Sequence, residues 1–143
     1  MNKIIVAFDG SDHSMRALEK AKEIVKAFES TLIIVYVVDN DLYHAGINRS
    51  IVIERINTLE TSKKNGEALL ARAKSLAEES GTNVETVLLD GDPSHMLLHY
   101  IKSSDADLVI IGSHGVKGLR QFMLGSVVSK IIHHVDKTVM IVR

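Results

Sequence analysis

Five short stretches rich in apolar and β-branched residues alternate along the chain with segments whose apolar positions recur at helical spacing. The stretches are residues 3–8, 31–38, 83–89, 108–111 and 138–142. In the first two, the apolar residues are consecutive, which indicates parallel strands covered by helices on both faces. Strands that alternate with helices predict an open, twisted α/β sheet, formed here by one domain over residues 1–143.

Four helical segments connect these strands. The first can be capped by Ser11 or Asp12, and the third by Asp92, which is followed by a proline at the first helical position. The second is predicted from about residue 56 to residue 80, and the fourth from residue 126 to about residue 134. Between residue 39 and about residue 57 the pattern weakens, so this stretch is predicted to be a mobile connection or lid.

The most distinctive pattern follows the strand at 108–111. Gly112 and Gly115 come first, and Gly125-Ser126 stands directly before the fourth helix. Glycine lets the backbone approach a ligand without a Cβ in the way, and a helix N-terminus favours an anion such as phosphate. We therefore predict a phosphate site here, with Ser126 as the N-cap of the helix.

Composition narrows the choice of function. Of the 143 residues, 45% are hydrophobic and 24% are charged, as is typical of a globular domain. A formal net charge of −1 provides no basic field for nucleic acid, and no apolar run is long enough to span a membrane. The chain has no cysteine, which excludes disulfides and thiolate chemistry. Its N-terminus does not resemble a signal peptide, so a cytoplasmic location is expected.

Other phosphate-binding and catalytic motifs do not match. There is no GxxxxGK[ST] P-loop, and the glycines at 112–118 do not have the GxGxxG spacing of dinucleotide sites. His95 and His99 are four residues apart on a predicted helix. They lack the glutamate of HExxH between them, so a metal role there is the less favoured interpretation. No Ser/His/Asp triad can be assembled from the sequence.

The ordered glycines resemble a known motif. Their spacing is similar to the nucleotide-binding motif of the universal stress protein family: two residues separate Gly112 from Gly115, and nine residues separate Gly115 from Gly125-Ser126. The opening IIVAFDGSDHS and the final IVR also look like this family, so the resemblance covers essentially the whole chain. It implies a Rossmann-like sheet of strand order 3-2-1-4-5. The first and fourth strands would then flank the crevice in which such sheets bind ligands.

The resemblance also implies a ligand. This would be ATP, with Mg²⁺ or Mn²⁺ on its phosphates and no metal-binding residue assigned. Asp9 would contact the ribose or base, and the backbone of Val37 would contact the adenine edge. Ser126 and Val127 would bind the terminal phosphates, and His114 would either touch phosphate or lie in an exposed turn. The full set of implied nucleotide-binding residues is Ala7, Asp9, Val37, Gly112, His114, Gly115, Arg120, Gly125, Ser126 and Val127.

The chain departs from the family pattern at two positions. Many members have a basic residue after the second glycine, where this chain has Val116. The phosphate charge would then be met by Lys117 or Arg120, or by the backbone and a metal ion. Thr138 stands where a proline often precedes the last strand, which affects the entry of that strand and not the site.

Three functions remain open at this point. The first is a nucleotide-binding regulatory protein, which the intact glycine spacing favours. The second is a slow ATPase, or an enzyme that transfers adenylate or a phosphoryl group, for which Asp9, His114 and Ser126 are weak candidates for the base or nucleophile. The third is an interaction module that binds no nucleotide.

The last strand predicts self-association. Residues 138–142 are apolar at nearly every position, so both faces are expected to be buried against helices. In the implied strand order this strand is an edge with unpaired backbone groups. A two-fold axis would let two copies pair, and we expect a homodimer through this strand, as the family resemblance also implies.

Overall fold

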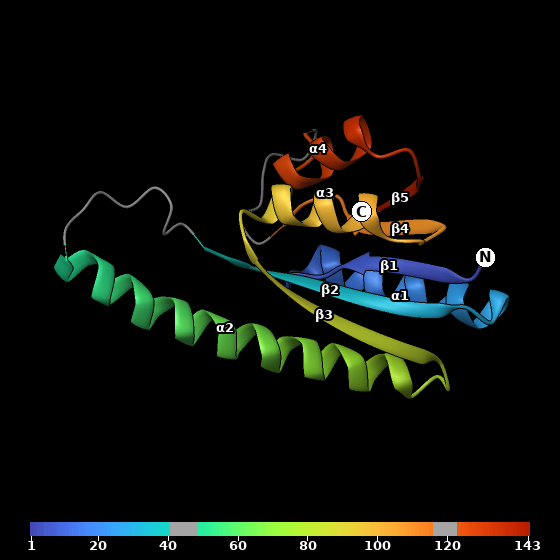
Figure 1. The fold of residues 1–143 in the computed structure, drawn as a ribbon. Coiled ribbons are helices and arrows are strands. Elements are labelled where there is room, and N and C mark those ends of the chain that lie inside the picture. The colour runs from blue at the N-terminus through green and yellow to red at the C-terminus, as the bar shows by residue number, and fades with distance from the viewer. Residues whose placement is uncertain (41–48, 116–122) are drawn as a thin grey trace.

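The computed structural model describes residues 1–40, 49–115 and 123–143. Its strands and helices alternate strictly (Figure 1): β1 Lys3–Ala7, α1 Asp12–Phe28, β2 Thr31–Asp39, α2 Arg49–Glu78, β3 Asn83–Gly91, α3 Pro93–Ser103, β4 Leu108–Gly112, α4 Ser126–His134 and β5 Thr138–Val142. Each pair of neighbouring strands is parallel, and the order is β3-β2-β1-β4-β5. The predicted fold class and strand order are therefore confirmed.

Successive residues of the central strands pack against opposite layers of helices. In β1, Ile4 and Val6 belong to the core beneath α1 and α2, whereas Ile5 belongs to the core beneath α3 and α4. All three side chains are fully buried. Figure 1 shows α1 and α2 on one side of the sheet and α3 and α4 on the other. Because both faces are covered, the strands need consecutive apolar residues, as the sequence pattern indicated.

Helix α2 begins at Arg49, so the predicted start near residue 56 is wrong. Of the predicted connection, Asp39 is the last residue of β2, residues 49–57 are helical, and residues 41–48 lie outside the described residues. The first turns of α2 extend beyond the sheet (Figure 1), and the side chains of Ile53 and Ile56 stay 55% and 42% exposed. Helical turns with no sheet beneath them have no buried face, so no apolar periodicity marks them.

Strand β5 forms one edge of the sheet and is less covered than expected. Thr138 is exposed, and residues 139–142 are only partly buried. Val139 packs toward the α3 and α4 core and Met140 toward the α1 and α2 core, so both faces touch a core without being sealed by it. No helix in the described parts of the chain combines the length and apolar character needed to cross a bilayer.

Candidate functional site

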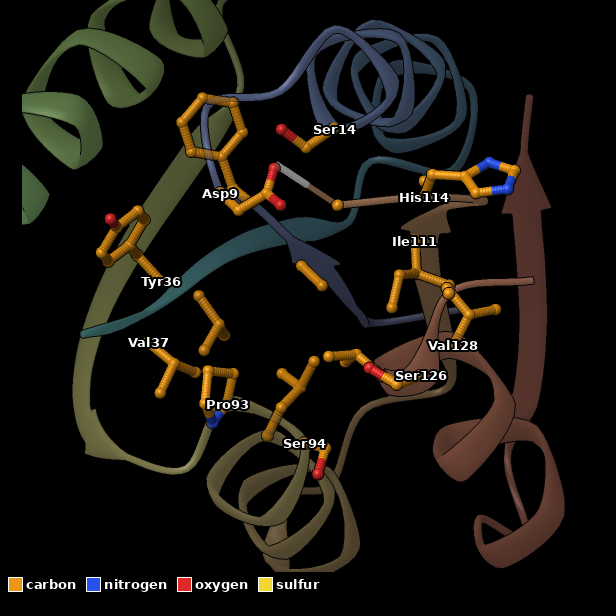
Figure 2. A pocket seen from close by; sticks show the side chains of 18 of the residues that line it. Asp9, Ser14, Tyr36, Val37, Pro93, Ser94, Ile111, His114, Ser126 and Val128 are labelled. Carbon is orange, nitrogen blue, oxygen red and sulfur yellow. The ribbon is translucent and has the colours of Figure 1, made fainter. Parts of the chain in front are cut away.

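One pocket opens at the carboxyl ends of β1, β2 and β4 (Figure 2), and its volume is about 380 Å³. Between β1 and β4 the strand order reverses, and α/β sheets bind ligands at such a point. Every implied nucleotide-binding residue that the structure describes lines this pocket: Ala7, Asp9, Val37, Gly112, His114, Gly115, Gly125, Ser126 and Val127. Arg120, like Val116 and Lys117, lies outside the described residues.

One part of the lining is apolar. Ala7, Val37 and Ile111 come from the ends of three neighbouring strands, and Leu97 of α3 lies beside them. Leu97 and Ile111 also belong to the core beneath α3 and α4, so close packing holds this wall in place. Such a wall suits the face of a planar aromatic ring better than it suits a sugar or a phosphate.

A second part of the lining is polar and carries Asp9 and Tyr36 (Figure 2). The Oδ1 atom of Asp9 accepts a hydrogen bond from the backbone N–H of Ser11 at 2.9 Å, which fixes the carboxylate against the start of α1. Burial raises the pKa of the Tyr36 phenol, and the negative charge of Asp9 raises it further. The phenol therefore stays neutral at neutral pH and remains a hydrogen-bond donor.

Three helices begin at the pocket, and side chains cap two of them. At the start of α1, the Oγ atom of Ser11 accepts from the N–H of Ser14 at 3.2 Å. At the start of α3, the Oδ1 atom of Asp92 accepts from the hydroxyl of Ser94 at 2.7 Å and from the N–H of His95 at 2.8 Å. These two bonds, the Ser94 bond above all, hold the pKa of Asp92 below its usual range. Both helix starts are as predicted.

The start of α4 is different, and the prediction that Ser126 caps it is wrong. The N-cap is Gly125, in an extended conformation (φ −60°, ψ 157°), and it has no side chain to accept a bond. Ser126 is already helical, and the first backbone bond of the helix runs from the N–H of Ser129 to the carbonyl of Gly125 at 2.9 Å. The N–H groups of Ser126 and Val127 precede that bond, and both residues line the pocket. The α4 N-terminus thus faces the pocket with no capping side chain of its own.

Gly112, the last residue of β4, and Gly115, in the loop after it, serve different purposes. A Cβ on Gly112 would lie 2.7 Å from the backbone carbonyl carbon of His13, so this glycine lets α1 approach β4 closely. A Cβ on Gly115 would lie 2.8 Å from Oδ2 of Asp9, so this glycine brings the loop backbone up to the carboxylate in the pocket. Only the second close approach concerns the ligand site directly.

His114 turns its ring away from the pocket (Figure 2), although its residue lines it. Its Nδ1 lies 3.0 Å from the buried hydroxyl of Ser113, which is also 3.1 Å from Nδ1 of His13. The two imidazole centroids are 5.1 Å apart. The histidine side chains therefore join the loop after β4 to α1, and the backbone of residue 114, not its ring, faces the pocket.

Sequence reasoning missed the lining that α3 contributes. Asp92, Pro93 and Ser94 line the pocket beside Ser126. The Nζ atom of Lys130 in α4 donates to the hydroxyl of Ser94 at 3.3 Å and ties the two helices together. The available signal was the position of Asp92 directly after a parallel strand, since the carboxyl ends of all strands in a parallel sheet share one edge.

Comparison with known proteins gives the family. A sequence model described as the universal stress protein family matches residues 1–143. A curated relative, universal stress protein YxiE of Bacillus subtilis, is 34% identical, and the match covers 99% of each chain. The chain belongs to the universal stress protein family.

Solved structures of universal stress proteins share this fold. UspA from Lactobacillus plantarum superposes with a TM-score of 0.88 at 23% identity, covering 99% of this chain and 97% of that one. A second universal stress protein, solved in complex with cAMP, has a TM-score of 0.73 and 26% identity, and it covers 99% and 97% of the two chains. The likeness extends over the whole domain, including the strand ends at which the pocket lies.

Proposed function

We propose that the protein binds ATP in this pocket and acts as a nucleotide-dependent regulatory protein in a stress response. The observation that carries the proposal is the uncapped N-terminus of α4, which faces a pocket with an apolar wall. A phosphate suits the first feature and a nucleobase suits the second. The universal stress protein solved in complex with cAMP supports an adenine nucleotide as the ligand.

The lining suggests how the nucleotide lies. Adenine would pack on the apolar wall, with the backbone of Val37 at its edge, and the ribose would reach Asp9. The phosphates would then meet the loop backbone at Gly115 and the N–H groups of Ser126 and Val127. This direction follows from chemistry, because Val37 lies on one side of the pocket and Ser126, at the start of α4, lies on the other (Figure 2).

A divalent cation fits this site only when it is bound to the phosphates of the nucleotide. Among the described residues, no group of three or more His, Cys, Asp or Glu side chains could hold a metal ion. Mg²⁺ commonly keeps several waters and binds through one or two carboxylates together with substrate phosphates. The Asp9 carboxylate lies close to Gly115, in the loop that would carry the phosphates, and the cation would neutralise phosphate charge there.

The geometry favours binding over fast catalysis. Of the three candidate groups, the His114 ring points away from the pocket, and Asp9 already accepts a bond from Ser11. The Ser126 hydroxyl has no His or carboxylate bonded to it among the described residues. We therefore infer that any hydrolysis is slow compared with the ~10 s⁻¹ of a median enzyme.

Two measurements test the proposed function. Mass spectrometry of small molecules released from the purified protein should detect ATP, and calorimetric titration should detect its binding. Gly125→Val should abolish binding while the variant still unfolds cooperatively. A Cβ at this position would meet its nearest atoms at 3.6 Å, so the residue itself fits, whereas the branched methyl groups would occupy the phosphate position. Gly125→Ala is the matched control for the Cβ alone, and undiminished ATP affinity in Gly125→Val would refute the site.

We also propose that the protein is a homodimer joined through β5, and that it is located in the cytoplasm. The partly buried apolar side chains of Val139, Met140 and Ile141 support an interface at this edge, because pairing would remove the rest of their surface from water. Light scattering over a concentration series should give twice the monomer mass. A monomer at tens of micromolar protein would refute the dimer.

A further inference from the structure

Helix α3 carries two histidines that take no part in the pocket. His95 and His99 are separated by one helical turn, so their Cβ atoms are about 5–6 Å apart on one face. Both residues are exposed, whereas Leu97 and Ile101 of the same helix are buried in the core. The two imidazoles thus stand side by side on the solvent-facing part of α3.

The helix that carries them is fixed at both ends. At its N-terminus, the Asp92 carboxylate caps the first turn and Pro93 occupies the first helical position. At its C-terminus, the N–H of Ser104 donates to the carbonyls of Tyr100 and Ile101. The backbone positions of the two histidines are therefore preorganised, and a ligand that bridges them has to order only the side chains.

The rings of His95 and His99 differ from the other exposed histidines of the described chain. His133 and His134 each place Nδ1 against the backbone carbonyl one turn earlier, at 2.6 and 2.9 Å. Within residues 1–40, 49–115 and 123–143, the rings of His95 and His99 have no hydrogen-bond or ion-pair partner. Their nitrogens are available to an external ligand.

We propose that His95 and His99 form a two-histidine chelate for a late first-row divalent cation, with Cu²⁺ bound more tightly than Ni²⁺ or Zn²⁺. Neutral imidazole is a good ligand for these ions, and a ring nitrogen binds at about 2.0–2.1 Å. Two rings one helical turn apart can reach a common point between them. The absence of an HExxH glutamate excludes a metalloprotease, but it does not affect chelation by the two rings.

The chelate supplies two protein ligands, and water completes the coordination. In the described residues no set of three or more His, Cys, Asp or Glu side chains is placed to share an ion. Asp92 is the nearest acidic residue toward the start of the helix, and its Oδ1 is already engaged by Ser94 and by the N–H of His95. A two-ligand exposed site binds less tightly than a closed structural site and leaves positions open to exchange.

Titration of the untagged, nucleotide-free protein with Cu²⁺, followed by electron paramagnetic resonance, tests the proposal. The first equivalent should show coupling to two nitrogens. Loss of a group that hydrogen-bonds to a metal ligand already costs about 10–100-fold in affinity. His95→Ala and His99→Ala, which each remove a ligand, should therefore lower the affinity at least about tenfold. Acidification should release the ion from the wild type, because bound imidazole must be unprotonated.

The chain offers its own matched control. The double variant His133→Ala/His134→Ala removes two exposed histidines that are adjacent in sequence and already bonded to carbonyls, so it should leave the first equivalent unchanged. Equal loss in this control, or unchanged affinity in both single variants, would overturn the proposal. The readout contains no nucleotide, so the outcome is independent of the proposed ATP site.

Discussion

The starts of α3 and α4 lie beside one another on the same pocket, yet they are built differently. The N-cap of α3 is Asp92, whose carboxylate accepts from the N–H of His95, whereas the N-cap of α4 is Gly125, which has no side chain to accept a bond. Both helices carry the same partial positive charge at this end. The N-terminus of α3 is therefore capped by a side chain of the protein, whereas the N-terminus of α4 faces the pocket without a side-chain cap.

If the pocket binds a nucleotide as proposed, this difference makes the start of α4 the better place for its phosphates. Asp92 would repel a phosphate at α3, while nothing among the described side chains competes with a phosphate at α4. Pro93 and Ser94 line the pocket, so the start of α3 forms part of its wall. Three of the predictions below change these two helix starts, and one compares the two glycines at the end of β4 and in the loop after it.

The largest effect should come from Gly125→Asp, which gives α4 the cap that α3 has. The carboxylate would occupy the first N–H groups and repel the phosphates, so ATP affinity should fall about 100-fold, or ~2.7 kcal/mol. Stability should rise by a few tenths of a kcal/mol through capping. Calorimetric titration of ATP into Gly125→Asp and into Gly125→Asn, which has a neutral cap, separates repulsion by the charge from occupation of the N–H groups by the cap. Equal ATP affinity in Gly125→Asp and wild type would contradict the comparison.

Gly112→Ala should act on stability instead of binding. The new Cβ would meet the His13 backbone at 2.7 Å, so α1 would have to shift, at about 1–3 kcal/mol of unfolding free energy. Gly115→Ala is the matched change on the pocket side, where the new Cβ would meet the Asp9 carboxylate. Urea unfolding should distinguish the two, and a Gly115 variant less stable than the Gly112 variant would reverse the assignment.

Asp92→Ala makes α3 resemble α4 and should cost about 1 kcal/mol of stability through loss of the cap. Because the folded-state pKa of Asp92 lies below its usual value, the charged cap stabilises the protein above the ordinary carboxyl pKa. That contribution is lost as the pH falls through the folded-state pKa. Thermal unfolding of wild type and variant between neutral pH and pH ~3 should show the difference narrowing on acidification. A difference that is constant over this range would assign the effect to something other than the charged cap.

The smallest effect should come from Ser126→Ala. The hydroxyl is not a cap, and the backbone N–H groups remain, so ATP affinity should fall only a few-fold, as for one hydrogen bond of ~1 kcal/mol. Competition titration against ATP would measure it. A loss as large as that in Gly125→Asp would show that the hydroxyl, and not the helix start, holds the phosphates.

The sequence by itself determined the sheet and the loop that borders the site. Consecutive apolar residues such as those of β1 require two covered faces, and the alternation with helices then leaves few topologies. The spacing of Gly112, Gly115 and Gly125 predicted three residues that line the pocket. These are local properties, which a single stretch of chain expresses without knowledge of its neighbours.

Only the tertiary structure decided what each of these groups contacts, and which further residues line the pocket. Gly112 and Gly115 look alike in sequence, but one faces the backbone of α1 and the other faces Asp9. The early start of α2 was hidden because its first turns have no sheet beneath them, and hydrophobic periodicity reports only buried faces. Asp92 joined the site because parallel strands bring their carboxyl ends to one edge. Which residues meet there depends on strand order, and that order is a property of the assembled sheet.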